Sequence, residues 1–451
     1  MNKQKIIVGC DRSMVFGLCA LIYFLPISLA LVKSFAWFVT LVFFVKRSVA
    51  LSAAIQLPEP CRGPRFSSRI LQFLMAFKPL CTPLNRPIAI FVLACLLSSL
   101  MSQYPHLSWE GFFFKLIQNI LLYVCFMEAV NSGPRLKAFL TVFLISLTLV
   151  SIDGLSQAFW GIEFIRGHNE IPNRVYACFK QANDFASYLI VGVVLTLSIL
   201  LFWFFSKDYV PKVFYGKGKM LNWSVAWAPK IWVYILFLLL ITCLGLTYSR
   251  GAWLGFFLAL ALIGFQRPKS IPVLFFIAIF FWIIFFPNMK QSRNVSFVSD
   301  NVELAGNEQF SGMGRIHIWK EAIAIIRDYP VFGCGLNTYT EIGPKYKVDW
   351  GGYPHNCYLQ MAAETGLVGL LAFLWLVFNF FKEALKALSR AVNQPFWYSV
   401  LLGLAAGVAG FLFHSFLDTN LYSVQLTNLF WATIATAMAI QKYVLPSDST
   451  V

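Results

Sequence analysis

The chain has 451 residues, of which 59% are hydrophobic and only 12% are charged, and its mean hydropathy is +0.69. A typical soluble domain carries about 25% charged residues, so this composition excludes a water-soluble globular fold, whose single core could not bury so many apolar side chains. The apolar runs lack the strict alternation of a transmembrane β-barrel. The composition therefore predicts an all-α polytopic membrane protein. At about 20 residues a span, the apolar residues supply on the order of ten to thirteen spans.

The formal charge of +16 raises the question of a nucleic-acid partner. The basic residues, however, form short groups between apolar runs rather than one contiguous face, which indicates membrane topology and no nucleic-acid binding. The ten cysteines include no CxxC pair and no Cys/His cluster. They predict neither a metal site nor a disulfide framework, although Cys334 and Cys357 flank one loop and leave a pairing open. No cofactor is indicated.

Apolar runs and helix breakers predict about twelve transmembrane helices in one membrane-embedded domain, 1–451. Nine spans fall within 13–287, a long loop covers 288–354, and three spans fall within 357–441. The segment from Leu18 to Val45 could instead form one broken helix, but Pro26 and Lys33 favour a hairpin, and the basic N-terminus is expected to precede an uncleaved first span. The predicted spans are 13–30, 32–45, 87–103, 112–130, 136–157, 184–205, 231–248, 252–266, 271–287, 357–381, 396–413 and 421–441.

The charge distribution predicts the orientation of these spans. With the N-terminus in the cytoplasm, the inside segments hold 23 of the 36 basic residues and six of the 20 acidic ones. The inside then carries +17 and the outside −1, which favours twelve spans with both termini in the cytoplasm and the loop 288–354 outside. The basic segment from Lys46 to Arg86, with its apolar stretch Ile70 to Phe77, is expected to lie along the anionic inner leaflet.

The outside loop contains a predicted amphipathic helix near 315–328. Its apolar residues Ile316, Trp319, Ile323 and Ile326 recur at helical spacing, and we expect it to lie at the membrane surface. Arg315 then occupies the first turn, free to reach an anion, although the alternative is that it extends to the membrane interface. Gly333 and Gly335 follow in a segment that can form a tight turn or a backbone nest for an anion, and the turn is favoured.

The next motif places a histidine at the outer end of a helix. Pro354 suits a first helical turn, so His355 and Asn356 are expected at the mouth of the tenth span. His355 can accept a proton near neutral pH, and the alternative is an interfacial histidine without a catalytic duty. Asn356, Gln360 and Glu364 recur on one face, which predicts that this face meets a cavity or another polar helix. Tyr353, Asn356 and Trp319 are candidate substrate-binding residues.

Arg250 lies in TYSRGAW, in a short connection between two apolar runs. No acidic residue lies within twenty positions on either side, so a buried guanidinium here would need a distant side chain or a bound anion. The alternative is contact with lipid head groups. Arg174 belongs to a second cationic loop. His414 and Asp418 are one helical turn apart and could form a general-base pair, although a structural hydrogen bond is favoured.

These residues offer arginine and histidine but no DxD, HExxH or paired-Asp cluster, which disfavours a divalent-metal mechanism. Guanidinium groups can replace a metal because they bind a pyrophosphate in bidentate fashion and stay charged. The motifs SRGAW, GRIHIW, PxxGxGxNTY and PHNCYLQMAAETGLVGLLAF, between about Thr247 and Phe381, resemble those of the O-antigen ligase and polymerase superfamily of bacterial membrane glycosyltransferases.

The resemblance implies a multi-span fold of the GT-C type in the bacterial inner membrane, with a periplasmic active site. It implies metal-independent, inverting transfer of a glycan from undecaprenyl pyrophosphate to lipid A-core, to a growing glycan or to a protein hydroxyl. By the same resemblance Arg250 and Arg315 bind the pyrophosphate, and His355 deprotonates or orients the acceptor. Arg174 is carried over less directly.

Ligase activity is favoured, which would place the chain in lipopolysaccharide biosynthesis. An O-antigen polymerase and a protein O-oligosaccharyltransferase are the enzymatic alternatives. A transporter or flippase is the alternative of another class, but it would place charges near the middle of the membrane and show internal pseudo-symmetry.

Overall fold

The computed structural model describes residues 3–52, 82–169, 173–205, 223–294, 312–346 and 352–445. These residues are predominantly helical, which confirms the predicted all-α class. Within the described ranges the only sheet is a short antiparallel hairpin of β1 (Ile162–Glu163) and β2 (His168–Asn169). The expected leaflet segment 70–77 and the loop residues 295–311 lie outside the described residues.

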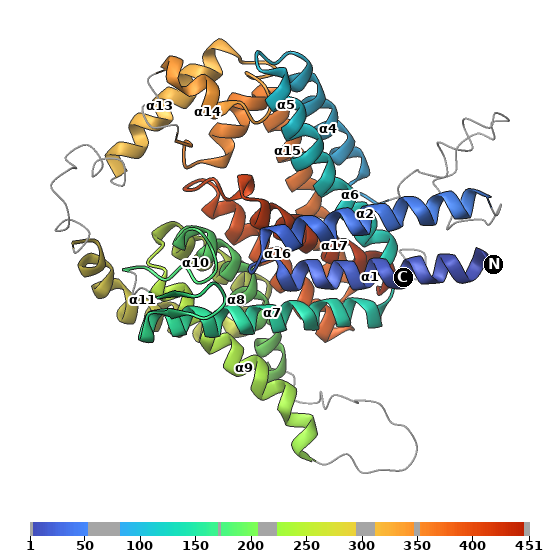
Figure 1. Ribbon diagram of the computed structural model, residues 1–451. Helices are drawn as coiled ribbons and strands as arrows, with labels where there is room; N and C mark the ends of the chain where they lie inside the picture. The colour runs from blue at the N-terminus through green and yellow to red at the C-terminus, as the bar shows by residue number, and fades with distance from the viewer. Residues whose placement is uncertain are drawn as a thin grey trace. The chain divides into compact units, whose positions relative to one another are not determined.

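Each predicted span coincides with helical structure (Figure 1). Eight helices of the described ranges are long and apolar enough to cross a membrane, and three shorter ones are also apolar. The total of twelve spans and their sidedness stay predictions. The longer helices are α1 (Lys3–Phe24), α2 (Leu29–Ser52), α4 (Asn85–Leu100), α5 (Pro105–Gly111), α6 (Gln118–Ala129), α7 (Gly133–Trp160), α8 (Ala182–Phe205), α9 (Trp223–Leu246), α10 (Arg250–Gln266), α11 (Ile271–Asn294), α13 (Gly312–Asp328), α15 (Cys357–Arg390), α16 (Pro395–His414) and α17 (Val424–Tyr443).

Shorter helical segments join or extend these helices. The π-helix η1 (Phe112–Ile117) links α5 to α6, so the predicted span 112–130 begins earlier, at Pro105. The four-residue helix α14 (Tyr339–Ile342) follows α13. The remaining short segments are the 3₁₀ turns η2 (Pro268–Ser270), η4 (Gly343–Tyr346) and η5 (Asn420–Tyr422).

The N-terminal region forms two helices, as Pro26 predicted. α1 ends at Phe24, and the turn closes where the Ser28 amide donates to the Phe24 carbonyl oxygen at 3.0 Å. α1 starts ten positions before the predicted boundary at residue 13, because polar side chains such as Asp11 do not interrupt the helix. Figure 1 shows α1 and α2 side by side.

The chain forms two compact units, and each combines segments that are far apart in the sequence. Unit 1 consists of Met1–Phe143, Glu303–Ala387 and Ser415–Val451. Unit 2 consists of Leu144–Val302 and Leu388–His414.

Unit 1 contains a buried cluster of four charges. The Lys46 ammonium lies 2.6 Å from a carboxylate oxygen of Asp11 and 2.6 Å from one of Glu128, and Arg47 pairs with the second oxygen of Glu128. Lys46 and Arg47, counted above among the basic residues facing the cytoplasm, are therefore buried within the protein. The two acidic residues that neutralise them were assigned to the same side of the membrane, so the net charge predicted for that side is unchanged.

Unit 2 is built around the apolar helix α8, which packs against α16, α9 and α10. Glycines allow the closest helix approaches. A Cβ atom at Gly255 of α10 would lie 2.4 Å from the Gly410 carbonyl oxygen of α16, and one at Gly410 would lie 2.7 Å from the Gly255 oxygen. Gly403 meets the Leu195 Cα of α8 in the same way. Small residues that let backbones touch are a common means of packing membrane helices.

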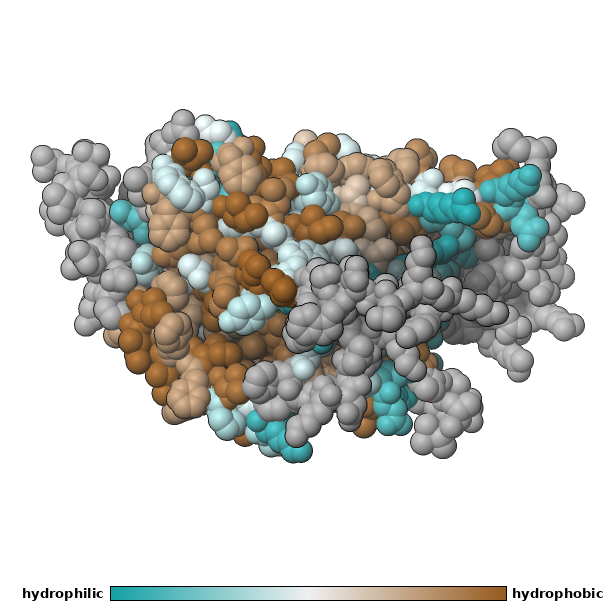
Figure 2. Space-filling model, turned by 90° about the horizontal axis from the view of Figure 1, so that it is seen from below, coloured by the Kyte–Doolittle hydropathy of each residue, from teal (hydrophilic) through white to brown (hydrophobic). Residues whose placement is uncertain are grey.

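Large apolar side chains remain exposed on the outer faces of the helices. On α11 the exposed residues include Phe276 and Phe280, and apolar residues cover much of the face drawn in Figure 2. Such surfaces are unfavourable in water and suit hydrocarbon, which agrees with a membrane protein.

We predict that Gly255→Ala destabilises unit 2, because the added methyl group would overlap the Gly410 carbonyl. Overpacking of this kind costs about 1–3 kcal/mol, and the apparent unfolding temperature in detergent should fall by several degrees. Gly9→Ala is the matched control, since nothing lies within 4 Å of a Cβ at Gly9. Equal unfolding temperatures for the two variants would show that the α10–α16 contact is looser than described.

Candidate active site

The candidate site is organised around a break in α15. Gly366 has φ +67° and ψ −179°, so the helical hydrogen-bond pattern is interrupted there. The residues that follow α13 fill the gap: the Leu367 and Val368 amides donate to the Pro330 and Val331 oxygens at 2.9 and 3.3 Å. In the opposite direction, the Cys334 and Gly335 amides donate to the Ala363 and Glu364 oxygens at 2.9 and 3.0 Å. A broken helix is tolerated within a membrane protein when its freed backbone groups find such partners.

Glycines make this backbone contact possible. A Cβ at Gly333 would lie 2.3 Å from the Glu364 carbonyl carbon, and one at Gly366 would lie 2.1 Å from the Val331 oxygen. The predicted turn at Gly333 and Gly335 is therefore confirmed. The amides of Cys334 and Gly335 are occupied by carbonyl oxygens, so they do not form the alternative anion nest.

The predicted polar face of α15 meets this loop. The buried Glu364 carboxylate accepts hydrogen bonds from the Asn337 amide at 2.9 Å, the Tyr339 amide at 3.4 Å and the Gln360 side chain at 3.1 Å. Asn337 has φ +63°, a conformation that asparagine tolerates better than most residues. Glu364 thus holds the loop against α15 by satisfying its backbone donors.

His355 lies immediately before α15 in a left-handed backbone conformation, φ +46°. Its Nδ1 atom is 3.4 Å from an oxygen of Asp418, a nearly buried carboxylate that also accepts the Thr419 amide at 2.8 Å. The imidazole itself is 34% exposed. A carboxylate at Nδ1 favours the tautomer in which Nε2 carries the lone pair, so this arrangement suits proton acceptance at the exposed nitrogen.

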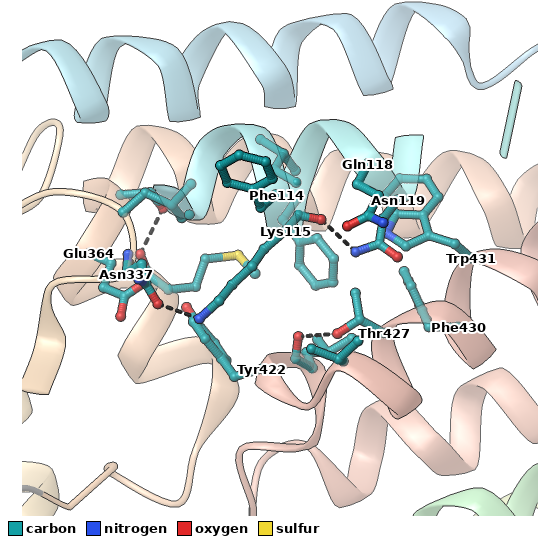
Figure 3. Close-up of a pocket in the computed structure, with 18 of the residues that line it drawn as sticks. Phe114, Lys115, Gln118, Asn119, Asn337, Glu364, Tyr422, Thr427, Phe430 and Trp431 are labelled. Carbon is teal, nitrogen blue, oxygen red and sulfur yellow. Dashed lines mark hydrogen bonds between the residues drawn. The ribbon is translucent and has the colours of Figure 1, made fainter. Parts of the chain in front are cut away.

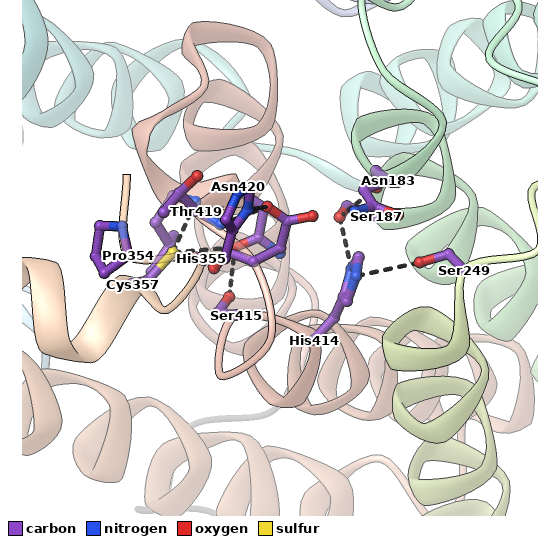
Figure 4. Close-up of polar contacts among 12 residues, drawn as sticks. Asn183, Ser187, Ser249, Pro354, His355, Cys357, His414, Ser415, Thr419 and Asn420 are labelled. Carbon is purple, nitrogen blue, oxygen red and sulfur yellow. Dashed lines mark hydrogen bonds and ion pairs between the residues drawn. The ribbon is translucent and has the colours of Figure 1, made fainter. Parts of the chain in front are cut away.

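The chain that follows His355 is held by several hydrogen bonds (Figure 4). The Cys357 amide donates to the Ser415 oxygen at 2.8 Å, and its thiol contacts the Asp418 carbonyl and the Asn420 side chain. The Asn356 side chain caps α15 by accepting the Tyr358 and Leu359 amides at 3.0 and 3.1 Å. These two hydrogen bonds give Asn356 a structural role at the start of α15 and occupy its side-chain oxygen.

The pairing left open between Cys334 and Cys357 does not occur, since both thiols are free and buried. The suggested pair of His414 and Asp418 rested on helical spacing. α16 ends at His414, so helical spacing does not continue to Asp418. Within unit 2, His414 instead contacts the Ser187 hydroxyl at 2.8 Å and the Ser249 hydroxyl at 3.4 Å.

The loop helix α13 is attached to the His355 segment. The Trp319 indole nitrogen donates to the Pro354 carbonyl oxygen at 3.0 Å, so Trp319 acts as an anchor within the protein. Arg315 belongs to the same helix, four positions before Trp319. Tyr353 is exposed next to this contact.

α13 buries residues outside the predicted apolar series. Ala322 and Ile325 are fully buried against Tyr339 and Ala363, and Ile326 of the series packs against the same cluster, whereas Ile323 is 41% exposed. Small side chains such as Ala322 allow the closest packing, and a pattern of large apolar residues does not identify them. α13 therefore packs on the loop and α15 of its own unit as well as presenting an apolar surface outward.

Unit 2 contains the other two predicted arginines. Arg250 begins α10, is exposed, and its guanidinium forms no hydrogen bond or ion pair with another residue of the described ranges. Because Arg250 is exposed, it does not need an anion partner to offset burial, and its charge is free to meet a ligand. Arg174 is committed to the protein, donating to the Thr247 carbonyl oxygen at 2.8 Å and the Asn183 side chain at 2.6 Å. It fixes the turn that leads into Arg250.

Sequence reasoning missed Asp418 as the partner of His355, although it is the only acidic residue between Glu383 and Asp448. It also missed Lys115, which donates to the Asn337 side chain at 2.5 Å. Lys115 lies within a predicted apolar span and belongs to no recognised sequence motif. Within the described ranges no group of three or more His, Cys, Asp or Glu side chains is placed to hold a metal ion.

Comparison with known proteins agrees with the motifs. Residues 235–374, which include Arg250, Arg315 and His355, match a family model described as O-antigen ligase. Two relatives, from Rickettsia conorii and Rickettsia bellii, are each provisionally named a polysaccharide ligase. The first is 23% identical over 250 residues, covering 49% of this chain and 59% of the relative. The second is 26% identical over 236 residues, covering 46% and 57%.

A third relative, from Rickettsia prowazekii and of the same provisional name, is 27% identical over 164 residues, which are 33% of this chain and 39% of the relative. The chain thus spans somewhat more than half the length of the first two relatives. The resemblance seen in the motifs is confirmed, since residues 235–374 match the O-antigen ligase family model.

Proposed function

We propose that this chain is a glycosyltransferase that moves a glycan from undecaprenyl pyrophosphate to an acceptor hydroxyl at the periplasmic face of the inner membrane. The observation that carries the proposal is the pairing of His355 with Asp418 at the start of α15, 3.4 Å apart. The helix that bears Arg315 is tied to the preceding residue, Pro354, through Trp319. The O-antigen ligase segment encloses these residues apart from Asp418.

In this proposal the acceptor hydroxyl gives its proton to Nε2 of His355 as its oxygen attacks the anomeric carbon. The bond between that carbon and the pyrophosphate oxygen breaks, the configuration inverts, and the bonding electrons leave with the pyrophosphate. Asp418 stabilises the imidazolium that forms. Arg250 and Arg315 bind the pyrophosphate, whose charge grows as the bond breaks, so two guanidinium groups stabilise the transition state more than the ground state and supply the charge otherwise expected of a metal.

The other candidate residues take different roles in the proposal. Arg174 positions the turn before Arg250, Asn356 caps α15, and Trp319 holds α13 in place. The exposed Tyr353 is the remaining candidate for direct substrate contact. The N-terminus of α15 adds a partial positive charge beside His355, which favours an anionic substrate group.

We predict that His355→Ala lowers the rate of glycan transfer by about 10²–10⁴-fold, the usual contribution of a general base. Asp418→Asn should lower kcat while leaving the KM for the donor nearly unchanged, because Asp418 acts through the imidazole. Purified protein with a lipid-linked glycan donor provides the assay. His106→Ala, at an exposed histidine on α5, is the control and should retain activity. Full activity of the His355 variant would remove this residue from the mechanism.

We predict that Arg315→Ala and Arg250→Ala each abolish transfer, and that Arg315→Lys is severely impaired because an ammonium cannot reproduce the bidentate geometry. The same assay in the presence of a chelator should show unchanged rates for the unmodified protein. Arg327→Ala serves as the matched control, since Arg327 is exposed on the last turn of the same helix. Equal losses in the Arg327 variant would indicate that damage to α13, rather than a lost phosphate contact, explains the result.

We further propose lipid A-core as the acceptor. Deletion of the gene followed by gel analysis of lipopolysaccharide should then yield core that lacks all attached glycan. Core bearing a single repeat would instead identify a polymerase. An unchanged ladder would contradict both and leave a protein hydroxyl as the acceptor to be tested.

A further inference from the structure

Unit 1 contains a pocket that the proposed reaction does not use (Figure 3). Its cavity volume is about 120 Å³. Its walls come from η1 and α6, from the loop at Asn337, from α15 around Glu364, and from η5 and α17. Aromatic side chains form much of the wall, among them Phe114, Tyr422, Phe430 and Trp431.

A lysine lies at this pocket in the middle of an apolar span. Lys115 belongs to η1, within the candidate span Pro105–Ala129, and its neighbours Phe113 and Phe114 expose their rings. Its ammonium donates to the neutral side-chain oxygen of Asn337 and forms no ion pair within the described ranges. Ionisable residues within spans are costly and usually functional, and π-helical turns often occur at functional sites. The charge therefore favours an anionic ligand that enters from the bilayer.

Two buried asparagines in the wall have acceptor oxygens without partners. Asn119 and Asn428 are each 6% exposed, and each amide nitrogen donates to a backbone oxygen of its own helix, of Lys115 and Val424 respectively. A carbonyl oxygen can only accept, so these bonds fix the orientation of both amides. The Oδ1 atoms have no hydrogen-bond partner among the described residues. An unpaired buried acceptor is unfavourable, so this region favours a ligand with hydroxyl or N–H donors.

Beyond the asparagines the side chains of α6 are mostly apolar. Leu122 and Phe126 line a second, small cavity of about 20 Å³ that shares Asn428 and Trp431 with the first. Along η1 and α6 the order is thus the Lys115 ammonium, the Asn119 acceptor one turn later, and then apolar side chains. This order describes the ligand: an acidic group, then a donor, then a hydrocarbon chain.

We infer that this pocket binds an anionic membrane lipid whose hydroxyl or amide N–H lies between its acidic head group and its hydrocarbon chain. Lys115 contacts the acidic group, Asn119 and Asn428 accept from the donor, and the hydrocarbon chain lies against the aromatic side chains of the wall. A polyprenyl phosphate does not match, because its phosphate joins the hydrocarbon directly and offers no donor. The inference goes beyond the proposed function and does not depend on it, since binding is measurable without glycan transfer.

The test compares four lipids by native mass spectrometry or competition binding on the full chain in detergent. Lysophosphatidic acid has the phosphate, the intervening hydroxyl and one chain. Its analogue 1-acyl-1,3-propanediol phosphate lacks only the hydroxyl, monoacylglycerol lacks the phosphate, and a polyprenyl monophosphate lacks the donor. We expect lysophosphatidic acid to bind about fivefold more tightly than its deoxy analogue and about tenfold more tightly than monoacylglycerol.

Variants assign these differences to residues. Lys115→Met should weaken lysophosphatidic acid about tenfold and leave monoacylglycerol unchanged, while Asn119→Leu combined with Asn428→Leu should remove the preference for the hydroxyl. Lys345→Met is the control, because Lys345 is an exposed lysine of the same unit that does not line the pocket. His355→Ala should bind lipid like the unmodified chain, which separates this site from the proposed reaction.

Several outcomes would overturn the inference. Equal binding of lysophosphatidic acid and its deoxy analogue would refute the donor requirement, and this comparison needs only the unmodified protein. Tighter binding of polyprenyl phosphate, lost in the Lys115 variant, would assign the pocket to a carrier lipid. The absence of saturable binding by any of the four lipids would show that the pocket holds only water.

Discussion

Four backbone hydrogen bonds across the break in α15 are the contact on which the candidate site depends. A helix inside a membrane cannot leave its amides and carbonyls unpaired, because hydrocarbon offers them no partner. The break at Gly366 is stable because the loop after α13 supplies two donors and two acceptors. The same contact ties α13 to α15, and it places the loop residue Asn337 in the wall of the pocket.

Electrostatics divides the basic residues into those the protein neutralises and those it leaves for ligands. Lys46 and Arg47 are paired with carboxylates in a buried cluster, and Arg174 is bonded to Thr247 and Asn183. Arg250 is exposed without a protein partner in the described ranges, and Lys115 donates to a neutral amide oxygen and forms no ion pair there. Charges of the first kind hold the structure in place, because a buried ion without its partner is strongly destabilising. Those of the second kind are the ones on which ligand binding is proposed.

Some of the candidate site residues could be predicted from sequence patterns, and others could not. His355, Arg250 and Arg315 stand in recognisable motifs, and their family segment could be identified without coordinates. The capping role of Asn356 could not be identified in this way, because a helix cap and a substrate contact use the same side chain, and only the observed bonds to Tyr358 and Leu359 show the cap. Asp418 was assigned to His414 because helical spacing was extended past the end of α16.

The sequence by itself determined the class of the protein, the positions of its apolar helices and the hairpin at Pro26, since these follow from local composition and helix breakers. It also revealed the resemblance to the O-antigen ligase family, through motifs that are contiguous in the chain. Only the tertiary structure decided which partner His355 has, which face of α13 is buried and where Lys115 lies, because each of these depends on residues distant in sequence. Hydrophobic periodicity predicts that a side chain is shielded from water, but it does not predict which other side chain it contacts.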